Sequence, residues 1–390
     1  MEELSIIIAA PLLVELCCVM VLMAIFLFRW KPETINDDLP LVTVFVPFYN
    51  EDKALLLTAL DKIDQQEYSS RLQVLIIDDG STNDTPDYVY QWLQQERKQS
   101  YVILNKPENT GRKGAALDFA LEQQVATGEI YIVVDSDTFI EPGGILALAN
   151  KIWSHPGYAA VCGYVVPKNR ESNLLCKSQF YEHIGVHGAL RTSQDQLGVV
   201  PVLAGAFVAH RASAVRELGG WSEWLVEDIS WCWKALAHRY RTGYTAQAIA
   251  TTQCPENNDA LFRQRRRWSR GRVEAFWETW KVSPAMGAMS LPWFLISATE
   301  FLFPPIFIAM PLFAVFDMWL PFSVMAIALL VESIFIFFFI AKTGNAHNLT
   351  RVEMAMLPLF THLLRFITWI PNILGYLDEI TGKDKKWLTR

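Results

Sequence analysis

The segment IYIVVDSD, residues 130–137, decides the fold, because a run of bulky apolar residues leads directly into two acids. Such a run is typical of a parallel strand that is buried on both faces. Residues at i and i+2 of an extended chain point the same way, so the carboxylates of Asp135 and Asp137 converge. Two like charges this close need a shared proton or a cation, and a divalent ion is the usual solution. DxD alone is common in turns, but at the end of this strand it indicates a site.

Three further runs of the same kind precede this one, at residues 42–46, 74–77 and 102–104. Amphipathic stretches that predict helices separate them, at residues 53–65, 85–98 and 114–126. This alternation, from Leu41 to about Lys281, predicts a doubly wound α/β sheet. Such sheets bind ligands beyond the carboxyl ends of their strands. Neither GxGxxG nor GxxxxGK[ST] follows a strand, which argues against a dehydrogenase-type dinucleotide site and a P-loop.

Polar motifs follow the other predicted strands as well. PFYNE (47–51) and DDGST (78–82) end the first two, and NTGRKGAA (109–116) opens a helix after the third. DDGST is compatible with a plain turn, and also with a carboxylate that holds a nucleotide's base or ribose. The basic loop is compatible with solvated charges at a helix start, or with a phosphate site where the helix dipole already favours anions.

Two motifs lie further along the chain. Glu227 and Asp228 precede an aromatic-rich helix, where an aspartate serves either as a helix cap or as a general base. QRRRW (264–268) places Gln264, Arg267 and Trp268 on one helix face. Its arginine-rich surroundings also suit a segment next to anionic lipid headgroups.

Composition indicates a membrane protein, since 52% of the 390 residues are hydrophobic and only 19% are charged. We expect residues 5–28 to form an uncleaved span with its N-terminus outside. Residues 291–316 and 320–340 are two further expected spans, and residues 352–377 an interfacial or re-entrant helix. The six cysteines show no metal-ligand spacing, which favours reduced thiols, and the net charge of −7 argues against nucleic acid.

Taken in order, these motifs resemble those of membrane-bound family 2 glycosyltransferases of the GT-A fold. The processive synthases of poly-N-acetylglucosamine, hyaluronan, chitin and cellulose are nearest in appearance. The resemblance implies a cell-membrane enzyme with three parts and a tail: an anchor (1–31), a cytoplasmic GT-A domain (41–281), transmembrane and interfacial helices (285–378), and a basic cytoplasmic tail (379–390). It also implies Mg²⁺ or Mn²⁺ as the cofactor.

The resemblance implies roles for individual residues. Nucleotide contacts are expected from Pro47, Tyr49, Glu51, Asp79, Lys113 and Asp135. Asp137 would bind the metal and Asp228 would be the catalytic base. Arg267 would hold the diphosphate, while Gln264 and Trp268 would line the acceptor site.

The expected reaction is the inverting transfer of a sugar from a UDP-sugar, with UDP-GlcNAc as the leading donor, to a growing β-linked polysaccharide. Single transfer to a lipid is the alternative, because ceramide-type glucosyltransferases share QxxRW, a similar length and a single N-terminal anchor. A nucleotide-sensing scaffold without catalysis is a third interpretation, disfavoured by the intact set of acids. The expected partners are the donor, a glycan or lipid acceptor, the membrane and an accessory membrane subunit, without nucleic acid.

Overall fold

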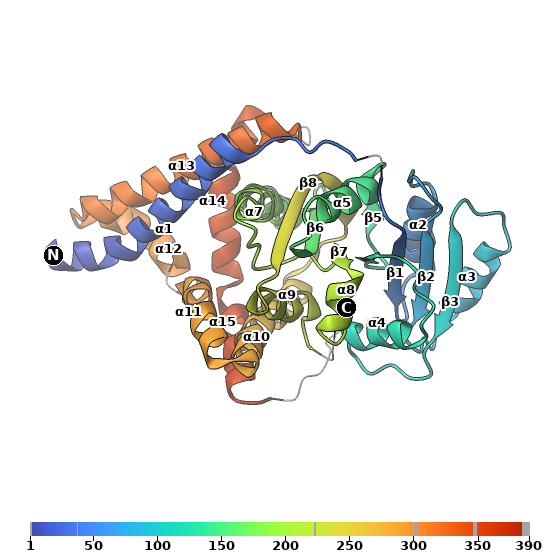
Figure 1. The fold of residues 1–390 in the computed structure, drawn as a ribbon. Helices are drawn as coiled ribbons and strands as arrows, with labels where there is room; N and C mark the ends of the chain where they lie inside the picture. The colour runs from blue at the N-terminus through green and yellow to red at the C-terminus, as the bar shows by residue number, and fades with distance from the viewer. Residues whose placement is uncertain are drawn as a thin grey trace.

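A computed structural model describes residues 2–36, 38–221, 224–299, 301, 303–345 and 349–383. An eight-stranded sheet lies at its centre, and a bundle of long helices lies to one side of it (Figure 1). The strands are ordered β3-β2-β1-β4-β7-β6-β8-β5. Most of the predicted basic tail, residues 384–390, lies outside the described residues.

The first half of the sheet is the predicted one. Its four strands run parallel to one another: β1 (Val42–Phe48), β2 (Gln73–Asp78), β3 (Ser100–Asn105) and β4 (Ile130–Val134). Alternate residues face opposite sides, so that Phe45, Tyr131 and Val133 belong to one buried cluster and Val44 and Ile132 to the other. Burial on both faces is why β1, β2 and β4 are mostly apolar, whereas β3 lies at the edge of the sheet and is partly exposed.

The second half of the sheet is mixed rather than parallel, which the sequence did not predict. It contains β5 (Phe139–Ile140), β6 (Tyr158–Pro167), β7 (Phe207–Arg211) and β8 (Arg241–Thr252). β7 is antiparallel to both β4 and β6, β5 is antiparallel to β8, and β6 and β8 run parallel. Because β7 runs antiparallel to β4, the loop that precedes β7 lies at the carboxyl end of β4.

Helices cover both faces of the sheet. One buried cluster includes side chains of α2 (Lys53–Asp64), α3 (Thr85–Leu93) and α5 (Gly144–Trp153). The other includes side chains of α4 (Lys113–Glu122) and α9 (Glu227–Ala237). The three helices predicted between the parallel strands therefore form, and they end one, five and four residues earlier than expected.

Smaller helical segments and one long helix complete this part of the chain. They are α6 (Leu174–Glu182), the π-helix η1 (His183–Leu190), α7 (Arg191–Asp195), α8 (Ala212–Glu217) and α10 (Asn258–Val282). α6, η1 and α7 follow one another without a break, so the chain runs from Leu174 to Asp195 as one helical stretch.

Two helices in the described residues are long and apolar enough to cross a membrane, α1 (Glu2–Arg29) and α13 (Trp319–Thr343). They lie side by side (Figure 1). Residues 291–316, where one span was expected, are divided between two helices, α11 (Pro284–Thr299) and α12 (Phe303–Val315). Pro304 and Pro305 sit in the first turn of α12, where proline is tolerated, but they disfavour a helix that continues from the residues before them.

The segment expected to be interfacial or re-entrant forms α14 (Arg351–Ile367) and α15 (Trp369–Ile380), with a bend of 47° between them. α15 is fixed to α10 by polar contacts. Arg266 Nε lies 2.5 Å from Asp378 Oδ2, and Arg270 Nε lies 2.7 Å from Glu379 Oε2. These two arginines therefore serve contacts within the protein, which differs from the predicted role of this basic segment at lipid headgroups.

Candidate active site

The loops after β1 and β4 are joined by one hydrogen bond. The hydroxyl of Ser136, between the two acids of the DSD motif, donates to Glu51 Oε2 at 2.7 Å. The backbone N–H of Asp135 donates to the carbonyl of Ala206 at 3.1 Å, which holds the motif against the segment before β7. Ser136 and Asp137 are buried, whereas Asp135 is partly exposed. Glu51, predicted to contact the nucleotide, thus also fixes the turn of the DSD motif.

The loop after β2 holds Asp79 in a polar network. Lys106 Nζ lies 2.7 Å from Asp79 Oδ1, and Asn109 Nδ2 donates to Oδ2 at 2.9 Å. Burial raises the pKa of Asp79, while Lys106 opposes that rise. Gly80, with φ of +76°, lets the backbone at residues 108–109 approach, because a Cβ there would lie 2.8 Å from the nitrogen of Asn109. Tyr49 is exposed on the neighbouring loop after Pro47, the last but one residue of β1.

Lys113 lies where three parts of the chain meet. Its Nζ is 2.5 Å from Asp135 Oδ1 and 3.2 Å from Glu227 Oε1, and it donates to the carbonyl of Gly205 at 2.9 Å. Burial acts to lower the pKa of Lys113, but the carboxylates of Asp135 and Glu227 raise it above its usual value. The ammonium group therefore stays charged and draws the loop after β4 towards the start of α9.

Asp228 is the second residue of α9. Its Oδ2 accepts a hydrogen bond from the backbone N–H of Gly205 at 3.0 Å. The N-cap residue of α9 is Val226. Asp228 therefore does not cap the helix, which was the alternative to its predicted role as general base. Burial raises the pKa of Asp228 to about 7, the charge of Glu227 adds to the rise, and Lys113 opposes it. Such a carboxylate exchanges protons near neutral pH, as a general base must.

α10 supplies the third side of the site. Burial lowers the pKa of Arg267, whereas the charges of Glu227, Asp228 and Asp135 act to raise it, so its guanidinium lies within electrostatic reach of all three acids. Gln264 and Trp268, on the same helix face, are partly exposed. One residue of the DSD motif, Asp135, thus lies within electrostatic reach of Arg267, as do Glu227 and Asp228.

Trp268 is held by a pair that the sequence did not reveal. The guanidinium of Arg265 lies 4.5 Å from the centroid of the Trp268 ring. Both of its terminal nitrogens bond the carboxylate of Glu182, with Nη1 3.0 Å from Oε1 and Nη2 2.5 Å from Oε2. Glu182 ends α6, outside every motif, and no local pattern marks it.

No group of three or more metal-ligating His, Cys, Asp or Glu side chains occurs among the described residues. A metal ion at Asp137 would therefore take most of its ligands from substrate oxygens and water, which is the usual manner of Mg²⁺ at diphosphates. The carboxylate oxygens of Asp135 and Asp137 are ligands that suit a hard divalent cation of this kind, and Lys113 Nζ lies 2.5 Å from one of them, Asp135 Oδ1.

A family model described as glycosyl transferase family group 2 matches residues 130–341, more than half of the chain. The chain belongs to this family. The match begins at the first residue of β4, the strand that carries the DSD motif. The prediction of a family 2 glycosyltransferase is thereby confirmed.

Curated relatives include the poly-β-1,6-N-acetyl-D-glucosamine synthases of two staphylococci. That of Staphylococcus aureus is 28% identical to this glycosyltransferase over 242 residues, which are 62% of this chain and 57% of the relative. That of Staphylococcus epidermidis is 27% identical over 245 residues. This glycosyltransferase thus spans just over half the length of the curated relatives it matches.

A mannosyltransferase from Pyrobaculum calidifontis, solved in complex with GDP-mannose and Mn²⁺, has a similar structure. The TM-score is 0.62 at 19% identity, over 97% of this chain and 100% of the other. This likeness confirms the predicted GT-A fold. Because the alignment covers 97% of this chain, the structural similarity includes the flanking helices as well as the sheet.

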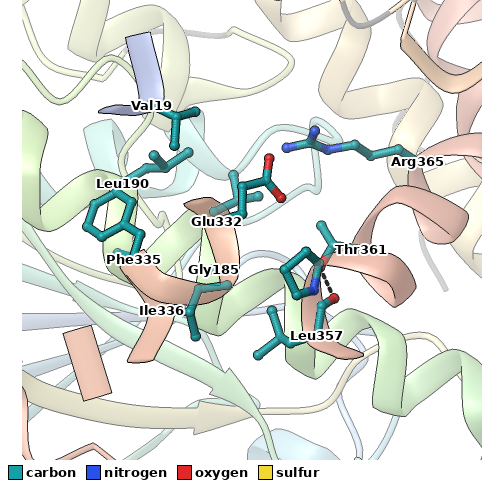
Figure 2. A pocket seen from close by; sticks show the side chains of 12 residues that line it. Val19, Gly185, Leu190, Glu332, Phe335, Ile336, Leu357, Thr361 and Arg365 are labelled. Carbon is teal, nitrogen blue, oxygen red and sulfur yellow. Dashed lines mark hydrogen bonds between the residues drawn. The ribbon is translucent and has the colours of Figure 1, made fainter. Parts of the chain in front are cut away.

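A cavity lies away from the site, between α1, η1, α13 and α14 (Figure 2). None of the residues discussed above line it. Its walls are mostly apolar, but Glu332 and Arg365 enter it with their charged groups turned towards one another. Glu332 Oε2 also lies 3.3 Å from His362 Nε2.

Proposed function

We propose that this protein is an inverting, metal-dependent glycosyltransferase that moves a sugar from a UDP-sugar to a growing β-linked polysaccharide at the membrane. The observation that carries the proposal is Asp228, a half-buried carboxylate that accepts the N–H of Gly205 within electrostatic reach of Lys113 and Arg267 and whose pKa is raised to about 7. Kinship with poly-N-acetylglucosamine synthases supports UDP-GlcNAc as the donor.

The proposed chemistry assigns the two sides of the site to the two substrates. Asp228 takes the proton from the acceptor hydroxyl as that hydroxyl attacks the anomeric carbon, and the single displacement inverts the configuration. Arg267 stabilises the negative charge that develops on the departing diphosphate. Asp137 would hold Mg²⁺ or Mn²⁺, and the ion would supply further positive charge to the diphosphate. Gln264 and Trp268 bind the acceptor, with the indole as a stacking surface.

The nucleotide is proposed to lie over the carboxyl ends of β1, β2 and β4. Pro47, Tyr49 and Asp79 would border the uracil and ribose, and Lys113 and Asp135 would lie next to the ribose and diphosphate. Glu51 acts here through Ser136, by fixing the turn that presents both acids.

The membrane part of the proposal follows from α1 and α13, the two helices that could span. Both would cross the cell membrane, with residues 41–281 as the cytoplasmic catalytic domain and residues 285–378 as membrane and interfacial helices. The short helices α11 and α12 leave few described spans to enclose a polymer, which favours a lipid acceptor as the second candidate, or an accessory subunit that completes the path.

Product sizing tests the proposal. Purified full-length protein in nanodiscs is incubated with a panel of labelled UDP-sugars and Mn²⁺, and UDP release and product length are measured. We expect a β-linked polymer from UDP-GlcNAc, and none from Asp228→Asn. One lipid-migrating product would support the single-transfer candidate. UDP binding without turnover in either protein, with unchanged cellular behaviour of Asp228→Asn, would support a scaffold instead.

A further inference from the structure

Lys106 lies outside every motif that the sequence analysis singled out, yet it is bonded to an acid proposed to border the uracil. It directly follows β3, and its backbone N–H donates to the carbonyl of Asp78 at 2.8 Å, which joins the ends of β2 and β3. Its Nζ lies 2.7 Å from Asp79 Oδ1. Only 12% of the Lys106 side chain and 8% of the Asp79 side chain are exposed, so this ion pair is poorly screened by water.

The ammonium group of Lys106 is fixed by two further contacts. It donates to the carbonyl of Glu108 at 2.7 Å and to the hydroxyl of Thr110 at 3.3 Å. An ammonium group has three donors, and these two contacts together with Asp79 use all of them. Lys106 therefore has no donor left for a ligand, and its effect on binding has to pass through Asp79.

The other oxygen of Asp79 also faces a donor. Asn109 Nδ2 donates to Asp79 Oδ2 at 2.9 Å, while Asn109 Oδ1 accepts the backbone N–H of Gly111 at 2.6 Å. The bond from Gly111 determines which end of the amide is the oxygen, so the end that faces Asp79 is the nitrogen. Donors at both oxygens favour the ionised form of a carboxyl group.

The charge on Asp79 results from opposing effects. Burial raises the pKa of Asp79. Among the described residues, the charged groups that act on it are Asp78, the last residue of β2, which adds to the rise, and Lys106, which opposes it through its hydrogen bond and its charge. Without Lys106, burial and Asp78 would together favour the protonated carboxyl group. Lys106 therefore controls the protonation state of Asp79.

The protonation state of Asp79 determines which base it can bind. An ionised carboxylate only accepts hydrogen bonds, so its partner on the base must be an N–H. Uracil has an N–H at N3, whereas cytosine, a base of the same size, has a lone pair there. A protonated carboxyl group can donate its O–H to that lone pair, which suits cytosine instead.

We propose that Lys106 is a positioning residue that holds Asp79 as a hydrogen-bond acceptor and thereby makes the nucleotide site select uracil over cytosine. The inference rests on the proposed transfer from a UDP-sugar and names the group that selects its base. Asn109 assists at the second carboxylate oxygen. Neither Lys106 nor Asn109 needs to touch the nucleotide, because both act through Asp79.

Nucleotide discrimination at two pH values tests this inference. Full-length protein in nanodiscs is titrated with UDP and with CDP in the presence of Mn²⁺ at pH 6 and pH 8, and dissociation constants are measured by calorimetry. We expect the unmodified protein to bind UDP about tenfold tighter or more at both pH values, since CDP lacks the N–H that bonds a charged group. Lys106→Met should lose most of this preference at pH 6. It should regain part of the preference at pH 8, because the carboxyl group of Asp79 is deprotonated as the pH rises.

Further variants distinguish this role from a merely structural one. Lys106→Arg keeps a charged donor and should keep the preference for UDP. Lys53→Met removes an equal charge at the start of α2, where Lys53 pairs with the exposed Asp84, and is the matched control. Asp79→Asn carries both a donor and an acceptor and should bind UDP and CDP with similar affinity at both pH values.

Two results would overturn the inference. One is a Lys106→Met protein whose preference for UDP equals that of the unmodified protein at pH 6. The other is a Lys106→Met protein that binds both nucleotides weakly at both pH values, since Lys106 would then only support the fold. Failure of the unmodified protein to bind UDP is a different result, and it would refute the proposed function itself.

Discussion

Replacing Gly205 with alanine would place a methyl group against the proposed catalytic base. A Cβ at this position would lie 2.6 Å from Asp228 Oδ2 and 3.0 Å from its Cβ and Cγ. The N–H of Gly205 bonds the same carboxylate, and its carbonyl accepts from Lys113. Any shift of the backbone at Gly205 away from Asp228 would disturb one of these two hydrogen bonds. We therefore expect the carboxylate of Asp228 to move instead.

The size of the effect follows from ordinary contact distances. Carbon and oxygen atoms normally approach to about 3.5 Å, so the carboxylate of Asp228 must move by about 1 Å. A misplacement of about 1 Å at a reacting group can cost roughly a hundredfold in rate. This corresponds to about 2.7 kcal/mol in the activation free energy.

Initial rates of UDP release, measured with saturating donor and acceptor, give kcat for Gly205→Ala. We expect kcat to fall about a hundredfold, with little change in the affinity for UDP. Gly185→Ala is the matched control, because its Cβ would meet Ile336 at an ordinary 3.4 Å. An unchanged kcat for Gly205→Ala would refute the placement of Asp228 as base. Equal losses of kcat and UDP affinity would mean that the backbone, rather than the carboxylate, had moved.

Further perturbations test other contacts. Because a base must be unprotonated and the pKa of Asp228 is about 7, kcat/KM should fall about tenfold per pH unit below pH 7 and level off above it; a flat profile from pH 5.5 to 9 would contradict this. Lys113 lowers that pKa, so Lys113→Met should shift the fall to higher pH, and a shift the other way would argue against the contact. Glu182→Gln leaves Arg265 buried and unpaired, which should cost roughly 3–5 kcal/mol in a denaturant melt; Glu182→Gln with Arg265→Met should recover part of the loss. EDTA should abolish turnover and added Mn²⁺ restore it, whereas activity that persists in EDTA would exclude the metal at Asp137.

The parallel half of the sheet was predictable because its strands are buried on both faces and follow one another along the chain. β1, β2 and β4 show this as strands that are mostly apolar. β7 and β8 do not, since β7 holds His210 and Arg211 and β8 alternates small and polar residues. Their place in the sheet depends on partners far away in the sequence, which no local period encodes.

The candidate site likewise has a part that could be predicted from the sequence and a part that could not. The DSD, ED and QRRRW motifs could be found because each is compact and stands at the end or start of an element. The contacts that join them could not. Lys113 and Gly205 are 92 residues apart, and Arg265 and Glu182 are 83 residues apart. The role of Glu51 in bonding Ser136 was hidden for the same reason, across 85 residues.

The fastening of α10 to α15 has a practical consequence for how this protein can be divided. A chain that stops before Arg351 would keep every catalytic motif but lose the acids that neutralise Arg266 and Arg270. It would also lose Gly375, whose missing side chain lets α15 lie against the carbonyl of Arg266. The helix that bears Arg267 and Trp268 would then have an uncovered, highly cationic flank. We therefore expect a chain cut before Arg351 to be unstable, since α15 covers one flank of α10.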